Sequence, residues 1–303
     1  MQQATQDENS ISISTPLGKD ALILTRFVYH EAMSELFNIK ADVFSNGQSI
    51  KQDELIGKEV TITLQLGKKK QRYLHAVVAD VTALGERVSE DAAGGEYRDY
   101  VLKLVPAAWY MQHRVNSRIF RAKNVLKIVE QIAGEHGVKI DVAAKIQASY
   151  PDYDFKVQYQ ESDFNFIARL LQQEGIFYYF EHTQSSHKLI LADKAAAYEP
   201  NAEAKVKFFS GSLSEAHIHS WQKALVMAPG KFVQRHFDLK KPTALPTGTA
   251  SKGQLVTGHA DYEVFSYDAE SEFHPRAKAI ADIRLEALQR DIARRNGASN
   301  CRT

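Results

Sequence analysis

Apolar and polar residues alternate with a period of two through the first third of the chain, the pattern of strands that bury one face. The alternation is clearest at positions 11–14, and longer segments rich in β-branched and aromatic residues follow. These segments span positions 22–29, 37–44, 60–66, 73–84 and 97–105. Strands at such short spacing predict a small antiparallel β-barrel over positions 1–105.

Positions 106–204 change to the spacing of helices with one apolar face. Asn124 and Ser162 are expected N-caps of two helices, which would end at Gly137 and Gly175. The apolar positions are Val125, Ile128, Val129 and Ile132 in the first helix, and Phe166, Ile167, Leu170 and Leu171 in the second. A strand at 155–159 and a hairpin formed by 176–180 and 189–191 complete a predicted α+β domain.

Strand patterns return over positions 205–303, at 206–209, 217–226, 232–237 and 261–267. A last helix is expected with Pro275 near its start. Its predicted apolar positions are Ile280, Ile283, Ala287 and Leu288. The segment 296–301 is rich in turn-forming residues and is predicted to have no fold of its own.

Composition is that of a globular protein, because 44% of the 303 residues are hydrophobic and 25% are charged. Lys and Arg number 38 against 37 Asp and Glu, and this net charge of +1 argues against a general nucleic-acid binder. Cys301 is the single cysteine, so no disulfide can form within one chain. The polar start lacks the apolar segment of a Sec signal, and the apolar run 176–180 is too short to span a bilayer. We therefore expect no stable membrane insertion.

Motifs of catalysis are missing from the sequence, which has no Gly-x-Ser-x-Gly, no P-loop and no Gly-x-Gly-x-x-Gly. His217 and His219 would share one face of a strand, and with other histidines they would form a metal site. Those other candidates are His182, His187 and His236. A lone spacing match favours edge or surface histidines instead, and Cys301 is interpreted as a bystander thiol.

Four carboxylates lie near the second predicted helix, and a glycosidase uses a pair of carboxylates for catalysis. They are Glu161, Asp163, Glu174 and Glu181. Structural roles fit better, with Asp163 in the first helical turn and Glu174 paired with Arg169 or solvating the last turn. The basic run Lys68, Lys69, Lys70 and Arg72 is interpreted as a hairpin tip, and docking of an acidic partner is the alternative. The aromatic run 177–180 favours core packing over a ligand platform.

The segment from Val157 to His182 reads VQYQESDFNFIARLLQQEGIFYYFEH and resembles the signature of VgrG proteins, the spike-hub components of type VI secretion systems. The positions that carry the resemblance are Tyr159, Glu161, Asp163, Phe166, Arg169, Leu170, Glu174, Gly175 and Tyr179. Further matching segments occur in the family's order at 24–27, 31–37, 55–60, 104–109, 118–120 and 261–267. The last of them lacks the Pro-Gly of the family. The resemblance covers nearly the whole chain.

The resemblance implies the fold of contractile-phage baseplate hubs. That fold is α+β and mainly β, with two small antiparallel β-barrels and an intervening α+β domain. We place the domains at 1–105, 106–204 and 205–303. The signature is then a packing signature, in which Tyr159 ends a strand, Phe166 and Leu170 are buried, Arg169 binds a carboxylate or backbone carbonyls, and Gly175 stops the helix.

The resemblance also implies partners and a location. Three protomers would form a ring of six barrels that joins the hexameric Hcp tube to the puncturing needle, with baseplate proteins and effectors as further partners. Assembly would take place in the bacterial cytoplasm, followed by expulsion through the type VI apparatus. No enzyme activity, cofactor, catalytic residue or metal site is expected.

Family members continue beyond the equivalent of Cys301. We therefore expect the second barrel to be truncated, with an exposed strand edge and weakened trimerisation. Three alternatives stay open: a hub of a phage or prophage tail, a cell-wall glycan hydrolase that uses Glu161 and Glu174, and a metal-dependent binding module that uses His217 and His219.

Overall fold

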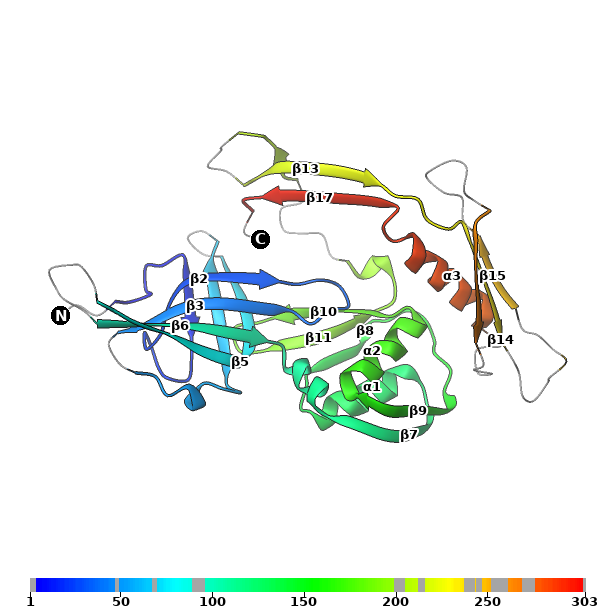
Figure 1. Cartoon of the computed structure of the whole chain (residues 1–303), viewed down its shortest axis with the longest axis horizontal. Coiled ribbons are helices and arrows are strands. Elements are labelled where there is room, and N and C mark those ends of the chain that lie inside the picture. The colour runs from blue at the N-terminus through cyan, green and yellow to red at the C-terminus, as the bar shows by residue number, and fades with distance from the viewer. Residues whose placement is uncertain are drawn as a thin grey trace. The chain divides into compact units, whose positions relative to one another are not determined.

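The computed structural model describes residues 4–46, 49–66, 70–88, 96–198, 205–211, 216–236, 243, 247–251, 261–268 and 276–301 (Figure 1). Lys68, Lys69 and Pro275 lie outside the described residues. The chain forms two compact units. The first comprises Met1–Pro151, Lys156–Arg169 and Ile176–Ala197, and the second comprises Asp152–Phe155, Leu170–Gly175 and Tyr198–Thr303. The predicted boundaries at 105 and 204 stay a prediction.

A curled six-stranded antiparallel sheet opens the first unit, in the order β1-β4-β5-β6-β3-β2. Its strands are β1 (Ile11–Ser14), β2 (Ile23–His30), β3 (Asn38–Asn46), β4 (Glu59–Gln65), β5 (Gln71–Val88) and β6 (Glu96–Val105), with a 3-10 turn at Gln52–Glu54. Alternating residues such as Ile39, Ile62 and Leu102 are fully buried on its inner face. The pairing of β5 with β6 shifts register twice, and such bulges increase the local bend and twist.

An α+β part follows, of which Asp152–Phe155 and Leu170–Gly175 belong to the second unit and the rest to the first. Its elements are a 3-10 helix (Ala107–His113), β7 (Val115–Lys123), α1 (Val125–Glu135), β8 (Ile140–Lys145), β9 (Tyr153–Ser162), α2 (Asp163–Glu174), β10 (Phe177–His182), β11 (His187–Ala192) and a short 3-10 turn (Ala195–Ala197). β10 and β11 form the predicted hairpin, to which β8 adds in parallel. β7 and β9 form a separate two-stranded sheet.

Both helices of this part begin and end as the sequence predicts. Asn124 Oδ1 accepts a hydrogen bond from the backbone N–H of Lys127 at 3.0 Å, and Ser162 Oγ accepts one from Asn165 at 3.1 Å. Gly137 and Gly175 follow the helices with φ of 66° and 73°, a region in which glycine is strongly favoured. The expected helix positions are therefore confirmed.

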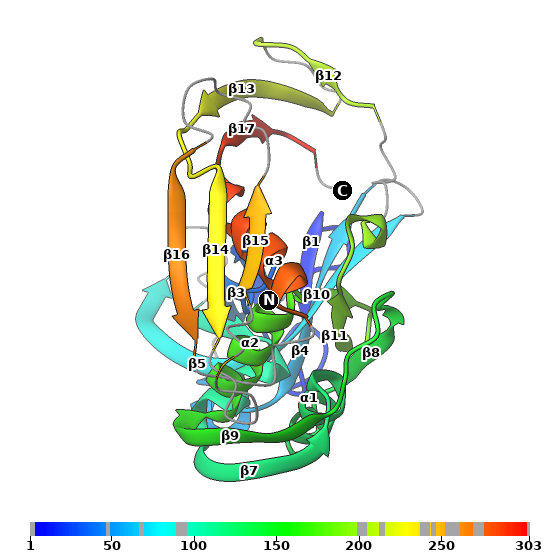
Figure 2. The ribbon, with the colours of Figure 1, turned by 90° about the vertical axis from the view of Figure 1, so that its right-hand side faces the viewer.

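The second unit contains β12 (Lys207–Phe208), β13 (His217–Leu225), β14 (Lys231–His236), β15 (Thr247–Ser251), β16 (Glu263–Asp268), α3 (Ala277–Gln289) and β17 (Ala293–Ser299). Figure 2 shows β16, β14 and β15 side by side with α3 against one face. Phe232 and Ala250 of this sheet pack with Ala281 and Leu285 of α3. The mainly β fold class is confirmed, although the described strands of this unit form two three-stranded sheets that contain parallel pairs.

Two local predictions in the second unit are wrong. The segment 296–301 was expected to have no fold, yet Ala293–Ser299 is β17 and pairs antiparallel with β13. Most side chains of β17 are exposed, so the sequence shows no alternation of apolar and polar residues. Backbone pairing with β13 holds the strand in place. Ala287 and Leu288 were placed on the apolar face of the last helix, but both are exposed, and Ala281 and Leu285 take the buried face instead.

No helix within the described part of the chain is long and apolar enough to cross a membrane.

Candidate functional site

Asp163, at the start of α2, is the most heavily coordinated of the signature residues and is fully buried. Gln158 Nε2 and Arg118 Nη2 donate hydrogen bonds to its Oδ1 at 2.8 and 3.0 Å. On the other side, Oδ2 accepts from Arg114 Nε and lies 2.9 Å from His136 Nε2. Burial alone would raise the pKa of this carboxyl, but hydrogen bonds from His136, Gln158 and Arg114 hold the pKa below its ordinary value.

Glu135, the last residue of α1, extends this network. Arg118 Nη1 donates to Glu135 Oε2 at 2.7 Å, Arg114 binds the same oxygen, and Gln131 Nε2 donates to Oε1 at 3.1 Å. Burial raises the pKa of Glu135, but bonds from these partners outweigh burial and leave the pKa lowered. Arg118 of β7 and Arg114, the residue before β7, thus join the last residue of α1 to the first residue of α2, which is a structural arrangement.

Arg169 on α2 binds both partners that the sequence suggested. Its Nη2 donates to Glu161 Oε1 at 2.7 Å and to the backbone oxygen of Val157 at 3.2 Å. The guanidinium carbon also lies 5.3 Å from the centre of the Phe166 ring, within cation–π range. Phe166 and Leu170 are fully buried.

Glu174 does not pair with Arg169, and it does not solvate the last turn of α2, so both suggestions are wrong. Its side chain is 1% exposed. Tyr153 donates its hydroxyl to Glu174 Oε1 at 2.6 Å, and Arg276 binds Oε2. Arg169 is unavailable because Glu161 holds it. These three residues belong to the second unit, where Arg276 directly precedes α3.

Tyr159 was expected to pack and to end its strand, and both expectations are wrong. The strand β9 continues to Ser162. Tyr159 is 68% exposed, because alternation along β9 turns Phe155, Val157 and Tyr159 outward. Val115 and Ile119 of β7 are likewise exposed. Tyr179, the last signature residue, is half-buried on β10. Phe155, Val157 and Tyr159 thus share one exposed face of β9, and an exposed apolar face is typical of protein contacts.

Three histidines of the first unit meet where the β10–β11 hairpin contacts β5: His75, His182 and His187. Nδ1 of His75 lies 2.9 Å from Nδ1 of His187. Burial lowers the pKa of His182 to about 4 and that of His187 to about 3, and it also lowers the pKa of His75. All three histidines are therefore neutral near pH 7, so their rings pack together without burying a charge.

The suggested metal ligands divide between the two units. His182 and His187 belong to the first unit, and His217 and His219 belong to the second, with ring centres 6.0 Å apart. His236 is also in the second unit and is fully buried on β14. Within the described ranges, no three His, Cys, Asp or Glu side chains are grouped so that they would hold a metal ion. Cys301 is half-buried.

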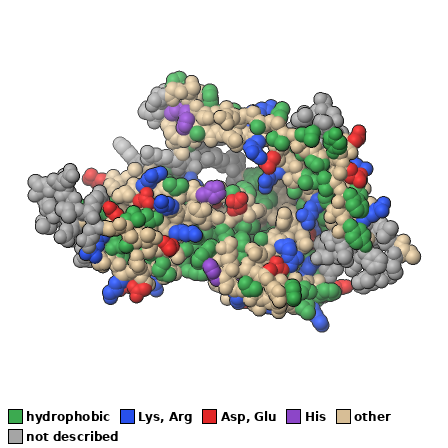
Figure 3. Space-filling model, in the orientation of Figure 1, with side chains coloured by type: hydrophobic (Ala, Val, Ile, Leu, Met, Phe, Trp, Pro, Cys, Tyr) green, Lys and Arg blue, Asp and Glu red, His purple; other side chains and the backbone are tan. Residues whose placement is uncertain are grey.

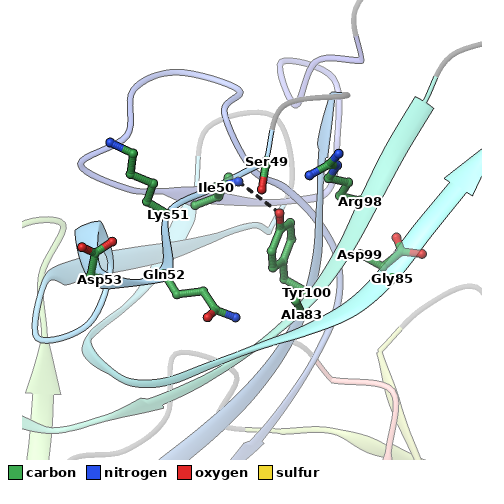
Figure 4. Close-up of a pocket in the computed structure, with 10 residues that line it drawn as sticks. All are labelled: Ser49, Ile50, Lys51, Gln52, Asp53, Ala83, Gly85, Arg98, Asp99 and Tyr100. Carbon is green, nitrogen blue, oxygen red and sulfur yellow. Dashed lines mark hydrogen bonds between the residues drawn. The ribbon is translucent and has the colours of Figure 1, made fainter.

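A polar cleft of about 520 Å³ opens beside β5 and β6 (Figure 4). Its lining residues are Ser49, Ile50, Lys51, Gln52, Asp53, Ala83, Gly85, Arg98, Asp99 and Tyr100. Tyr100 accepts a hydrogen bond from the backbone N–H of Ile50 at 3.1 Å, whereas Lys51 extends away from Tyr100. The charges are mixed in sign, and Ser49 has no histidine beside it among the lining residues. The cleft therefore has no nucleophile and base in the arrangement that covalent catalysis needs.

Sequence reasoning missed several residues that organise these contacts: Arg114, Glu135, His136, Gln158 and His75. Two signals were available, since Arg118 lies in a matched family segment and Gln158 lies in the signature segment itself. The others have ordinary sequence surroundings, and their partners are distant in sequence.

Comparison with known proteins identifies the family of the chain. The profile of the family described as Phage tail baseplate hub (GPD) matches residues 30–303. The chain belongs to this hub family.

Curated relatives of this hub chain are spike proteins. The type VI secretion system spike proteins VgrG1c and VgrG1a of Pseudomonas aeruginosa are 28% and 29% identical over 294 and 285 residues. The alignments cover 96% and 92% of this chain but 39% and 43% of the relatives. The hub chain thus spans about two fifths of the length of these spike proteins. The resemblance to VgrG is confirmed.

Solved structures share the fold of the hub chain. An Escherichia coli type VI secretion component, described as similar to the T4 tail proteins gp27 and gp5, has a TM-score of 0.58 at 19% identity, covering 71% of this chain and 56% of its own. The 43 kDa tail protein of a Shewanella oneidensis prophage has a TM-score of 0.57 at 11% identity, covering 95% and 81%. At these identities the likeness concerns the fold alone.

Proposed function

We propose that this chain is the structural hub of a type VI secretion spike. In this proposal its copies form a trimeric, pseudo-six-fold ring that joins the Hcp tube to the puncturing needle, contacts baseplate proteins and helps to deliver effectors. The observation that carries the proposal is the match of the hub family to residues 30–303, together with spike relatives along 96% of the chain.

The site chemistry supports a structural and not an enzymatic role. Asp163 is neutralised by arginines, and Glu161 and Glu174 are held by Arg169 and Arg276. A glycosidase needs one carboxyl group whose environment keeps it protonated, which is the opposite of these ion pairs. We propose that the chain has no catalytic centre. Turnover of purified peptidoglycan that disappears in Glu161→Gln would contradict this proposal.

The proposed domains are 1–105, 106–204 and 205–303, with the first and last as the ring-forming parts. The proposed location is the bacterial cytoplasm during assembly, followed by the exterior or a target cell after expulsion. The relatives support this location, since they are spike proteins of a type VI secretion system.

A chimera tests the function directly. The matching region of the VgrG1a spike of Pseudomonas aeruginosa is replaced by this chain, and Hcp released into the medium is measured. Release at near the parental level is expected, together with cross-links between the chimera and Hcp. A spike that lacks the hub region is the control. A chimera that accumulates normally but neither cross-links to Hcp nor releases it would overturn the proposal.

A hub of a phage or prophage tail is the second candidate, favoured by the fold of the Shewanella prophage tail protein. Neighbouring genes for a capsid and head, in place of genes for a membrane complex and Hcp, would favour this candidate.

A further inference from the structure

The second half of β5 has a free edge in the six-stranded sheet. β5 runs from Gln71 to Val88, but β4 and the two residues before it bond only as far as Val78. Beyond that point β6 pairs with one edge of β5, and no described strand pairs with the other. The ends of the sheet differ, because Gln6 bonds to both β1 and β2 there. An unpaired strand edge presents backbone N–H and C=O groups and is a template for another strand.

One hydrogen bond shows which way this edge points. Gln52 Nε2, in the 3-10 turn Gln52–Glu54, donates to the backbone oxygen of Val81 at 3.1 Å, so this oxygen points away from β6. Successive residues of a strand point their backbone groups to opposite sides, so Ala83, two positions on, points its N–H and C=O the same way as Val81. Ala83 lines the polar cleft of about 520 Å³. Gln52 thus occupies the first position of the edge, and the next position opens into the cleft.

Gly85 also lines the cleft (Figure 4). The pairing of β5 with β6 shifts register between Ala83 and Gly85, which marks a bulge at Leu84. Gly85 has a φ of 136°, which side chains rarely allow, and nothing lies within 4 Å of the place that a Cβ would take. A glycine inside a strand often marks a bulge or the close approach of a ligand or a second backbone. The open space at Gly85 leaves room for such a backbone.

Tyr100 brings a hydrogen-bond donor to the cleft. It lies opposite Ala83 in the β5–β6 pairing and is 4% exposed. Its oxygen accepts from the backbone N–H of Ile50 at 3.1 Å, and Figure 4 shows the hydroxyl directed toward this loop. Within the described residues the hydroxyl hydrogen has no acceptor, so it is left for an oxygen atom of a ligand.

The charges around the cleft balance. Lys51 and Arg98 contribute two positive charges, and Asp53 and Asp99 contribute two negative charges. On the face seen in Figure 3, acidic and basic side chains are likewise interspersed over the first sheet. A polyanion or a polycation would meet as much repulsion as attraction in the cleft. A peptide main chain suits it better, because each residue offers one donor and one acceptor and carries no charge.

A ligand that binds by stacking does not suit the cleft. Stacking needs the exposed face of an aromatic ring. The residues that line the cleft include one aromatic side chain, Tyr100, and its ring is buried. The recognition chemistry of the cleft is therefore that of hydrogen bonds, from a strand edge and one phenol.

We propose that this cleft binds an extended peptide segment of a partner protein, which adds to the free edge of β5. The peptide main chain pairs with the N–H and C=O of Ala83, runs past Gly85, and places a carbonyl oxygen where Tyr100 donates. In this mode of recognition, main-chain bonds give affinity and the surrounding side chains give specificity. The site goes beyond the proposed hub function, because it depends neither on ring formation nor on Hcp.

A phage-displayed library of short random linear peptides tests the site. It is selected on the immobilised chain, with counter-selection on Ala83→Pro. Proline removes the N–H that faces the cleft and leaves the neighbouring bonds to β6 in place. We expect a selected, fluorescein-labelled peptide to bind Ala83→Pro about tenfold more weakly than the parent, or weaker still, by fluorescence anisotropy. A library that yields no peptide with a preference for the parent overturns the inference.

Tyr100→Phe tests the site even where Ala83→Pro fails to fold. This variant keeps the ring and removes the donor, so binding of the selected peptide should weaken about twofold to tenfold, the loss of one hydrogen bond. Tyr73→Phe is the matched control, because it makes the same change on β5 at a hydroxyl that bonds to Gln71 and does not line the cleft. Equal binding by Tyr100→Phe and the parent overturns the inference.

Hydrogen exchange locates the bound peptide. Saturation with the selected peptide should slow exchange at the amide of Ala83 and leave the amides of β2 unchanged. A merely structural role of Tyr100 would not produce this local protection. Slower exchange along β1 or β2, without protection at Ala83, would place the peptide at the ends of the sheet and overturn the inference.

Two further measurements identify other occupants. Light scattering of the chain alone detects a second copy, and association that Ala83→Pro removes would assign the edge to a contact between copies. A soluble chito-oligosaccharide tests for a glycan, and binding of this sugar that Tyr100→Phe weakens, with no peptide protecting Ala83, would assign the cleft to glycans. Either result overturns the inference.

Discussion

Nδ1 of His75 lies 2.9 Å from Nδ1 of His187, so one of these nitrogens carries a hydrogen and the other accepts it. The backbone N–H of Ala107 donates to Nε2 of His187 at 2.9 Å, which places the hydrogen of His187 on Nδ1. His75 then accepts at Nδ1 and carries its own hydrogen on Nε2, which faces a carboxylate oxygen of Glu59 at 3.8 Å. Both rings must be neutral for this chain of contacts to hold.

Acidification is therefore expected to weaken the contact between the β10–β11 hairpin and β5. The pKa of His187 is about 3 and that of His182 about 4 in the folded chain, against an ordinary value of 6.5. Between these values the unfolded chain binds more protons, so the free energy of unfolding falls as pH drops from 6.5 to about 3, by at most about 1.4 kcal/mol per pH unit for each histidine. The charged groups near these histidines are Glu59, Lys139 and Arg72.

Urea unfolding at a series of pH values measures this dependence. His187→Gln should lower stability at pH 7 and flatten the loss between pH 6.5 and 4, since a titrating group has been removed. His30→Gln, at a histidine whose side chain is 64% exposed, should keep the slope of the parent. Parallel slopes for His187→Gln and the parent would show that His187 is not held neutral.

Asp163→Asn should destabilise the first unit strongly. The substitution leaves Arg114 and Arg118 beside a neutral amide at a fully buried position, and breaking such a pair costs about 3–5 kcal/mol. Asp282→Asn removes the exposed pair with Lys278 and should cost about 0.5 kcal/mol or less. Midpoints of urea unfolding compare the two variants. Similar losses for both would contradict the assignment of Asp163 as the centre of the network.

Periodicity and capping residues located the helices of the first unit because their causes are local. Asn124 and Ser162 act on amides three residues away, and Gly175 acts through its own φ. The partners of Glu174 could not be read in this way, because Tyr153 and Arg276 lie 21 and 102 residues distant. β17 was missed for the same reason: it exists through pairing with β13, about 70 residues earlier, and its own side chains carry no strand pattern.

Gly175→Ala should cost more than Gly137→Ala, although both glycines end helices with nearly the same φ. A left-handed conformation costs a non-glycine residue about 1 kcal/mol at either position. At Gly175 a Cβ would also lie 2.9 Å from Cδ1 of Ile283, whereas nothing lies within 4 Å at Gly137. Differential scanning calorimetry of the two variants checks the order.

A double-mutant cycle isolates the steric part of this difference. Ile283→Ala removes the atoms that a Cβ at position 175 would meet, so Gly175→Ala should cost less in its presence. The expected coupling is about 0.5 kcal/mol or more. Purely additive losses would mean that Ile283 moves away at no cost and that φ alone decides the preference for glycine.

Gln6→Ala should weaken the hydrogen-bonded contact between β1 and β2, the two edge strands of the six-stranded sheet. Gln6 Oε1 accepts hydrogen bonds from the backbone N–H groups of Ile13 at 2.9 Å and Leu24 at 3.1 Å, and Nε2 donates to the oxygen of Ile13 at 3.1 Å. Buried groups left without partners cost about 1–3 kcal/mol. Hydrogen exchange should therefore accelerate at the amides of Ile13 and Leu24 and stay slow at Ile62 in β4, while Asn9→Ala, at an exposed neighbour, leaves all three protected. Uniform acceleration across the sheet would show that Gln6 supports global stability and does not bridge these two strands locally.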